Sequence, residues 1–172
     1  MARRPDNPCP GLLVIDKPQG LTSHDVVSRV RRLARTRKVG HGGTLDPMAT
    51  GVLVIGIGKA TKLLTWVSGH SKEYRATIRF GVATNTDDAE GVATAAVGCD
   101  SLSEDQLESA LAPLRGDIMQ VPSTVSAIKV NGKRAYALAR AGEDVELAAR
   151  PVRISRLEVL APPRPVECVL EE

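Results

Sequence analysis

The chain has 172 residues, of which 42% are hydrophobic and 25% charged, as is ordinary for one globular domain. Only 2% are aromatic, so the core must consist mainly of Val, Leu, Ile and Ala. The apolar runs have the length of strands, far below the ~20 residues of a membrane-spanning helix, and no apolar signal segment follows Arg3 and Arg4. We therefore expect a cytoplasmic protein with no membrane association.

The cysteines and the charges further restrict the kinds of site that the protein can contain and the setting in which it works. Cys9, Cys99 and Cys168 lie far apart and form no C-x-x-C pair, which supports neither a metal site nor a disulfide framework and indicates a reduced setting. The net charge of +3 conceals two unlike halves, because residues 1–80 carry 14 Lys/Arg against 5 Asp/Glu and residues 81–172 carry 9 against 15.

Six of the ten residues at positions 29–38 are basic, namely Arg29, Arg31, Arg32, Arg35, Arg37 and Lys38. A cluster of this kind is typical of a surface that binds a polyanion. A solvated helix face would have the same composition, so this pattern alone leaves both interpretations open.

In the first half of the chain, residues 1–10 hold three prolines and predict a disordered lead-in. Residues 11–16 predict a strand. Ser23 is a candidate N-cap for a helix whose apolar positions are Val26, Val27, Val30, Leu33 and Ala34. Residues 38–47 read as a loop, and residues 51–57, apolar at nearly every position, as a buried strand.

In the middle of the chain, residues 60–67 predict a short helix. Residues 74–80 alternate between apolar and polar side chains, which predicts a half-buried strand. Residues 81–91 read as a polar loop and residues 93–97 as a short strand. Ser103 and Gln106 form a capping box for a helix to about residue 114.

Towards the end, residues 115–122 lead into a hairpin whose first strand is 126–130 and whose turn is Asn131-Gly132. Residues 134–141 predict a helix and residues 152–160 a strand. Because strands and helices are mixed without strict alternation, we expect an α+β fold with a mixed, mainly antiparallel sheet flanked by helices.

The segment from Gly40 to Gly51 is the most informative part of the chain. It places Asp46 in a loop rich in glycine and threonine, close to His41 and directly before a rigid strand, where catalytic residues are often found. Taken alone, Asp46 is better explained as a turn residue before Pro47, and His41 as a capping or packing histidine. His24 and His70 match no motif and are interpreted as surface or capping residues.

Five segments at ordered spacing carry a resemblance to a known family. They are GLLVIDKPQGLTS (11–23), VGHGGTLDPMATG (39–51), KEY (72–74), GVATNTDDAEG (81–91) and the segment 116–136 with GDIMQVPS, SAIK and KRAY. Together they resemble the bacterial TruB family of tRNA pseudouridine synthases. The likeness implies a pseudouridine synthase catalytic fold over residues 11–172, with a small RNA-gripping insertion, and a monomer.

The resemblance also implies an activity: isomerisation of uridine-55 in the T-loop of tRNA, with no metal or organic cofactor. The implied nucleophile is Asp46, with His41 near the extruded base and Tyr74 stacked on the flipped uracil. Lys17, Gly43 and Thr44 are further substrate-binding candidates. Candidate RNA contacts are Arg29, Arg32, Arg35, Arg37, Lys38 and Lys129.

The residue types agree with this chemistry. An ionised carboxylate can attack and later leave. The target base must come out of its stack, which costs least in a single-stranded loop, and an aromatic ring then supports it. Gly43 would let the backbone approach the nucleotide closely, while Lys17 and the basic helix face would hold phosphates.

The chain departs from the family pattern after residue 165. Val166-Glu167-Cys168 resembles the start of the family's C-S-x-G-T-Y-I-R strand, but no G-T-Y-I-R follows. We therefore expect a catalytic domain that lacks this strand, whose arginine would pair with Asp46, and lacks the family's C-terminal RNA-binding domain. The alternatives are a non-catalytic RNA-binding or tRNA-folding module and an inactive truncated remnant.

Overall fold

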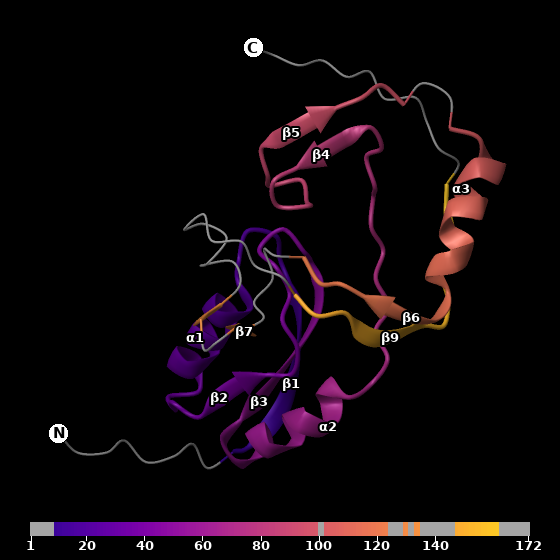
Figure 1. The fold of residues 1–172 in the computed structure, drawn as a ribbon. Coiled ribbons are helices and arrows are strands. Elements are labelled where there is room, and N and C mark those ends of the chain that lie inside the picture. Colours follow the sequence, from indigo (N-terminus) through magenta and orange to yellow (C-terminus); the bar gives the residue numbers. More distant parts are fainter. Residues whose placement is uncertain (1–8, 100–101, 124–128, 131–132, 135–146, 162–172) are drawn as a thin grey trace. The chain divides into compact units, whose positions relative to one another are not determined.

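The structure, a computed structural model, describes residues 9–99, 102–123, 129–130, 133–134 and 147–161 (Figure 1). The chain divides into two compact units, Met1–Arg75 and Ala76–Glu172. The predicted lead-in at residues 1–10 and the predicted helix at residues 134–141 fall largely outside the described residues.

The first unit is built on a three-stranded antiparallel sheet in the order β1-β3-β2. Its strands are β1 (Gly11–Lys17), β2 (Val39–His41) and β3 (Gly51–Ile57). The two longer strands confirm the prediction. The short strand β2 lies in the segment predicted to be a loop, and that prediction was wrong because three residues are too few to show a period.

Helix α1 (Ser23–Leu33) covers one face of this sheet. Its apolar stripe packs against the sheet in one cluster of buried residues, namely Val26, Val27, Val30, Val39, Leu53 and Ile55. Burial of this stripe holds the helix in place, because so short a helix is marginal by itself in water.

The N-cap of α1 is Thr22, one residue before the predicted Ser23. Thr22 and Asp25 form a reciprocal capping box, with the Asp25 N–H donating to Thr22 Oγ1 at 3.0 Å and the Thr22 N–H to Asp25 Oδ2 at 2.9 Å. The side-chain hydrogen bond from Thr22 lowers the pKa of Asp25. Ser23 is thereby left to bond elsewhere.

The opposite face of the sheet receives η1 (Gly58–Leu63) and α2 (Leu64–Ser68), which together replace the predicted helix at 60–67. Gly40 and Gly56 are paired across β2 and β3, and Leu64 lies over both. A Cβ at Gly56 would come within 3.0 Å of Leu64 Cγ and of the Thr61 Cα, so only glycine lets the helix approach this closely.

The strand predicted at residues 74–80 does not form. None of the paired strands in the described part of the chain includes these residues, and Tyr74 and Ile78 are 70% and 66% exposed. An alternating pattern indicates that one face of a strand could be buried. It does not show whether a neighbouring strand is present to pair with it.

The second unit contains two further antiparallel pairs. Strands β4 (Val82–Thr84) and β5 (Ala93–Ala96) pair with a register shift at Ala83/Thr84, so the first part of the predicted loop at 81–91 is a strand. Strands β6 (Gly116–Gln120) and β9 (Arg150–Ile154) pair at wide sequence separation. The predicted strand at 152–160 therefore begins earlier and ends sooner.

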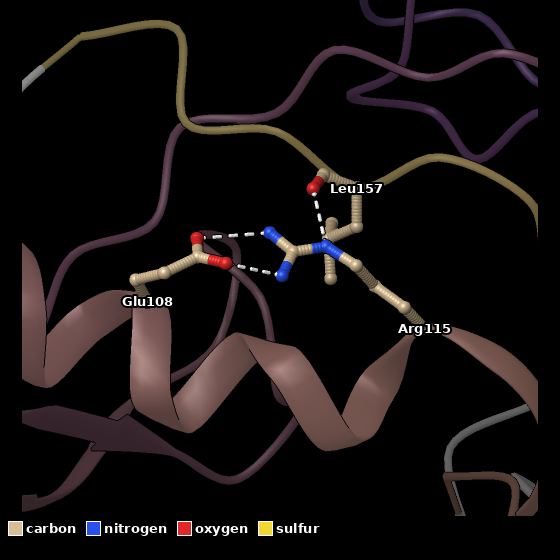
Figure 2. A network of polar contacts seen from close by, with 3 residues as sticks. All are labelled: Glu108, Arg115 and Leu157. Carbon is tan, nitrogen blue, oxygen red and sulfur yellow. Dashed lines mark hydrogen bonds and ion pairs between the residues drawn. The ribbon is translucent and has the colours of Figure 1, made fainter.

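Helix α3 (Glu104–Leu111) and η2 (Ala112–Leu114) confirm the predicted helix and its capping box. Figure 2 shows Arg115 clamping Glu108 with both terminal nitrogens and donating from Nε to the Leu157 carbonyl at 2.8 Å. The pair lowers the pKa of Glu108, chiefly through this hydrogen bond. The clamp ties α3 to the segment after β9.

Strands β7 (Lys129–Val130) and β8 (Lys133–Arg134) pair across the predicted Asn131-Gly132 turn. The described elements thus form an α+β fold of antiparallel pairs and helices, as expected. Within the described residues no helix is both long and apolar enough to cross a membrane.

Candidate active site

The loop that carries Asp46 runs between two strands of one sheet. It leaves β2 at His41 and enters β3 at Gly51, and the Gly42 N–H extends the ladder by donating to the Val54 carbonyl at 2.8 Å. Both ends of the loop are therefore fixed to the same rigid element. Asp46 itself is exposed, so its carboxylate is open to solvent and to a ligand.

Ser23 fixes the backbone immediately before Asp46. Its side chain is buried, and its Oγ accepts the Leu45 N–H at 2.9 Å and donates to the Leu45 carbonyl at 3.0 Å. One hydroxyl thus bonds both backbone polar groups of Leu45, the residue before the candidate nucleophile. These two hydrogen bonds connect α1 to the loop.

Lys17 fixes the backbone on the other side of Asp46. Its side chain is fully buried, and its Nζ donates to the carbonyls of Leu21 at 2.7 Å, Pro18 at 3.1 Å and Pro47 at 3.3 Å. An ammonium has three hydrogens, and each has an acceptor here. The structure therefore contradicts the predicted phosphate contact of Lys17 and makes it an anchor of the loop.

His41 contacts the loop that it introduces. Its Nδ1 hydrogen-bonds the Gly43 carbonyl, and because a carbonyl only accepts, Nδ1 carries the hydrogen. The ring of His24 meets that of His41 edge to face, with centroids 5.9 Å apart and planes at 81°. His24 does not cap α1, since Thr22 does; it is exposed, which confirms the alternative prediction of a surface residue.

Gly43 and Thr44 belong to the loop that carries Asp46. Gly43 has φ +144°, and an added Cβ would meet no atom within 4 Å. The backbone conformation, not crowding, is what requires glycine there. Thr44 is exposed. Their predicted contacts with substrate stay predictions.

The basic residues of α1 and of the turn after it are on the surface. Exposed members include Arg29, Arg32, Arg35, Arg37 and Lys38. Arg31 is exposed as well, but one of its terminal nitrogens donates to the Val39 carbonyl at 3.1 Å and links α1 to β2. The side chain of Lys129 lies outside the described residues, and Tyr74 occupies the exposed segment after α2.

Sequence reasoning missed the role of Ser23, although a signal was present. Ser23, Val26, Val27 and Val30 share the buried stripe of α1, so a hydroxyl stands where the pattern calls for an apolar side chain. A buried hydroxyl requires a hydrogen-bond partner, and the Leu45 backbone supplies it. Among the described residues, no group of three or more His, Cys, Asp or Glu side chains could hold a metal ion.

Comparison with known proteins assigns the family. The model of the TruB family pseudouridylate synthases, N-terminal domain, matches residues 31–171. The match covers most of the chain, including Asp46 and the turn that carries Arg35, Arg37 and Lys38. The chain belongs to this family.

Curated relatives agree. The "tRNA pseudouridine synthase B" of Mycobacteroides abscessus is 65% identical over 151 residues, which is 88% of this chain and 51% of the relative. That of Mycobacterium avium is 61% identical over 160 residues, 93% of this chain and 52% of the relative. The chain spans about half the length of these relatives. A chain of a solved "Cbf5-Nop10-Gar1 Complex" is 28% identical, with a TM-score of 0.46, over 69% of this chain and 31% of that one.

The Ser23→Ala variant should destabilise the first unit by about 1–3 kcal/mol, because the N–H and C=O of the half-buried Leu45 lose their side-chain partner. Chemical denaturation measures the loss, and hydrogen exchange of the Leu45 amide should become faster. Ser68→Ala, which removes one bond from an exposed serine to the Leu64 carbonyl, is the matched control and should change little. Unchanged exchange at Leu45 would contradict the assignment.

The Lys17→Met variant should lower the free energy of unfolding by about 3 kcal/mol or more. A methionine fills similar space but removes the Nζ donor from the Leu21, Pro18 and Pro47 carbonyls. The Pro47 carbonyl still accepts the Gly20 N–H at 2.8 Å. Urea unfolding measures the change. Lys59→Met, at an exposed lysine of η1, should stay within about 0.5 kcal/mol of the wild type; equal effects of the two variants would show that Lys17 is no anchor.

Proposed function

We propose that this chain provides the catalytic part of a cytoplasmic tRNA pseudouridine synthase that acts as a monomer on uridine-55 of the T-stem-loop. The single observation that carries the proposal is an exposed carboxylate, Asp46, whose flanking backbone is fixed on both sides. Membership of the TruB family and relatives named tRNA pseudouridine synthase B support the reaction class.

The chemistry asked of Asp46 is a reversible attack. Its carboxylate adds to the extruded nucleoside, the bond between ribose C1′ and uracil N1 breaks, and a bond from C1′ to C5 forms. The proton lost from C5 is balanced by the one gained at N1, so the reaction is an isomerisation. A carboxylate can both form and leave such an adduct, and its fixed backbone positions it in advance of the reaction.

The RNA would be held by charge and by stacking. The exposed side chains of Arg29, Arg32, Arg35, Arg37 and Lys38 offer positive charge for phosphates. His41 would contact the RNA near the extruded base, and Tyr74 would stack on the uracil. Gly43 and Thr44 would meet the nucleotide, and Lys129 would add a contact from the insertion.

Asp46→Asn should lower pseudouridine formation on a T-stem-loop RNA by about 10³-fold or more, because the neutral amide is a poor nucleophile. The RNA dissociation constant should change little. Asp16→Asn, at an exposed carboxylate of β1, is the control and should keep full activity. A wild-type amount of product from Asp46→Asn would reject the role of Asp46. If the unsubstituted chain binds the RNA but forms no product, the non-catalytic RNA-binding module is favoured.

Arg29→Ala should weaken RNA binding to a similar degree for different sequences and reduce the slope of log Kd against log salt by about one. The reason is that a phosphate contact releases a counterion and carries no sequence information. Titration of the RNA at several salt concentrations measures this. Lys62→Ala, at an exposed lysine of η1, should leave both affinity and slope unchanged, and an unaltered slope for Arg29→Ala would place the phosphates elsewhere.

A further inference from the structure

Two of the three histidines of this chain meet beside the Asp46 loop. His24 comes from the first turn of α1 and His41 from the end of β2. The turn between these two elements carries Arg35, Arg37 and Lys38. His24 is exposed, so it is not a core residue, and Thr22 already caps the helix. Neither of the roles predicted for His24 as a capping or plain surface residue accounts for its ring contact.

The position of His24 relative to Asp46 follows from the hydrogen bonds between α1 and the loop. Ser23, the residue before His24, is bonded through its hydroxyl to both backbone groups of Leu45, the residue before Asp46. These two hydrogen bonds join Ser23 to Leu45, and His24 and Asp46 are the residues that directly follow them in the chain. The start of α1 therefore lies next to the backbone that leads into Asp46.

The ring of His41 is held by a hydrogen bond, and the ring of His24 lies exposed beside it. His41 has its Nδ1 committed to the Gly43 carbonyl, which fixes the orientation of its ring. The edge-to-face contact then leaves the His24 ring exposed next to a ring that is already held. Single-stranded RNA is recognised by stacking of unpaired bases on aromatic rings, histidine included.

We propose that His24 is a second RNA-contacting residue of this site, one that stacks on an unpaired base next to the nucleoside held at His41 and Asp46. The inference rests on the proposed function, because it needs an RNA loop at Asp46. It adds a contact that distinguishes unpaired from paired RNA, which the arginines cannot do, since phosphates are present in both.

The test compares a T-stem-loop RNA with a fully paired duplex of the same length. For His24→Ala the affinity for the stem-loop should fall about 5- to 150-fold, the range expected for loss of one stacked base, and the affinity for the duplex should not change. His24→Tyr, which keeps an aromatic face, should bind within about threefold of the wild type. His70→Ala, at the exposed third histidine, should bind both RNAs as the wild type does.

A double-mutant cycle between His24 and His41 on the stem-loop completes the experiment. Effects that are not additive would show that the two rings act as a pair. If the wild type prefers the stem-loop and His24→Ala binds it equally well, or loses both RNAs alike, the inference is wrong while the proposed function stands. If the wild-type chain binds neither RNA, the proposed function fails and this inference fails with it.

Discussion

The double hydrogen bond between the Ser23 hydroxyl and the Leu45 backbone is the contact on which the geometry of the site depends. It joins the first turn of a helix to a loop 22 residues further along the chain. Lys17 completes the arrangement from the other side through Pro47. Asp46 thus has a fixed backbone and an exposed side chain, a combination that lets a carboxylate be both positioned and reachable.

Helix α1 serves several purposes at once because its faces differ. One face is buried with Val26, Val27 and Val30 and continues to Ser23, while the arginines occupy the exposed surface. A rigid helix connects the two, so the distance from a phosphate held at Arg29 to the loop at Leu45 is set by the fold. The proposed RNA contacts and the proposed nucleophile are therefore positioned by the same element.

The sequence predicted those parts of the fold whose signals are local. Strand β3 was marked by its apolar run and α3 by the capping box of Ser103 and Gln106, and both are confirmed. The strand predicted at residues 74–80 was wrong, because alternation does not reveal whether a pairing partner exists. Short β2 and β4 gave no period at all, since pairing with distant strands decides them.

The candidate site was predictable to a similar extent. A motif located Asp46, but it could not distinguish a lysine that meets substrate from one that holds the loop, and Lys17 is the second kind. A fully buried ammonium is costly unless every N–H is bonded, and three carbonyls meet this condition only after β1, the turn that follows it and the Asp46 loop have come together. Those acceptors are 1, 4 and 30 residues from Lys17, so the most distant one is visible only in the folded chain. The residue that resembles a phosphate contact in sequence is for this reason a part of the loop's support.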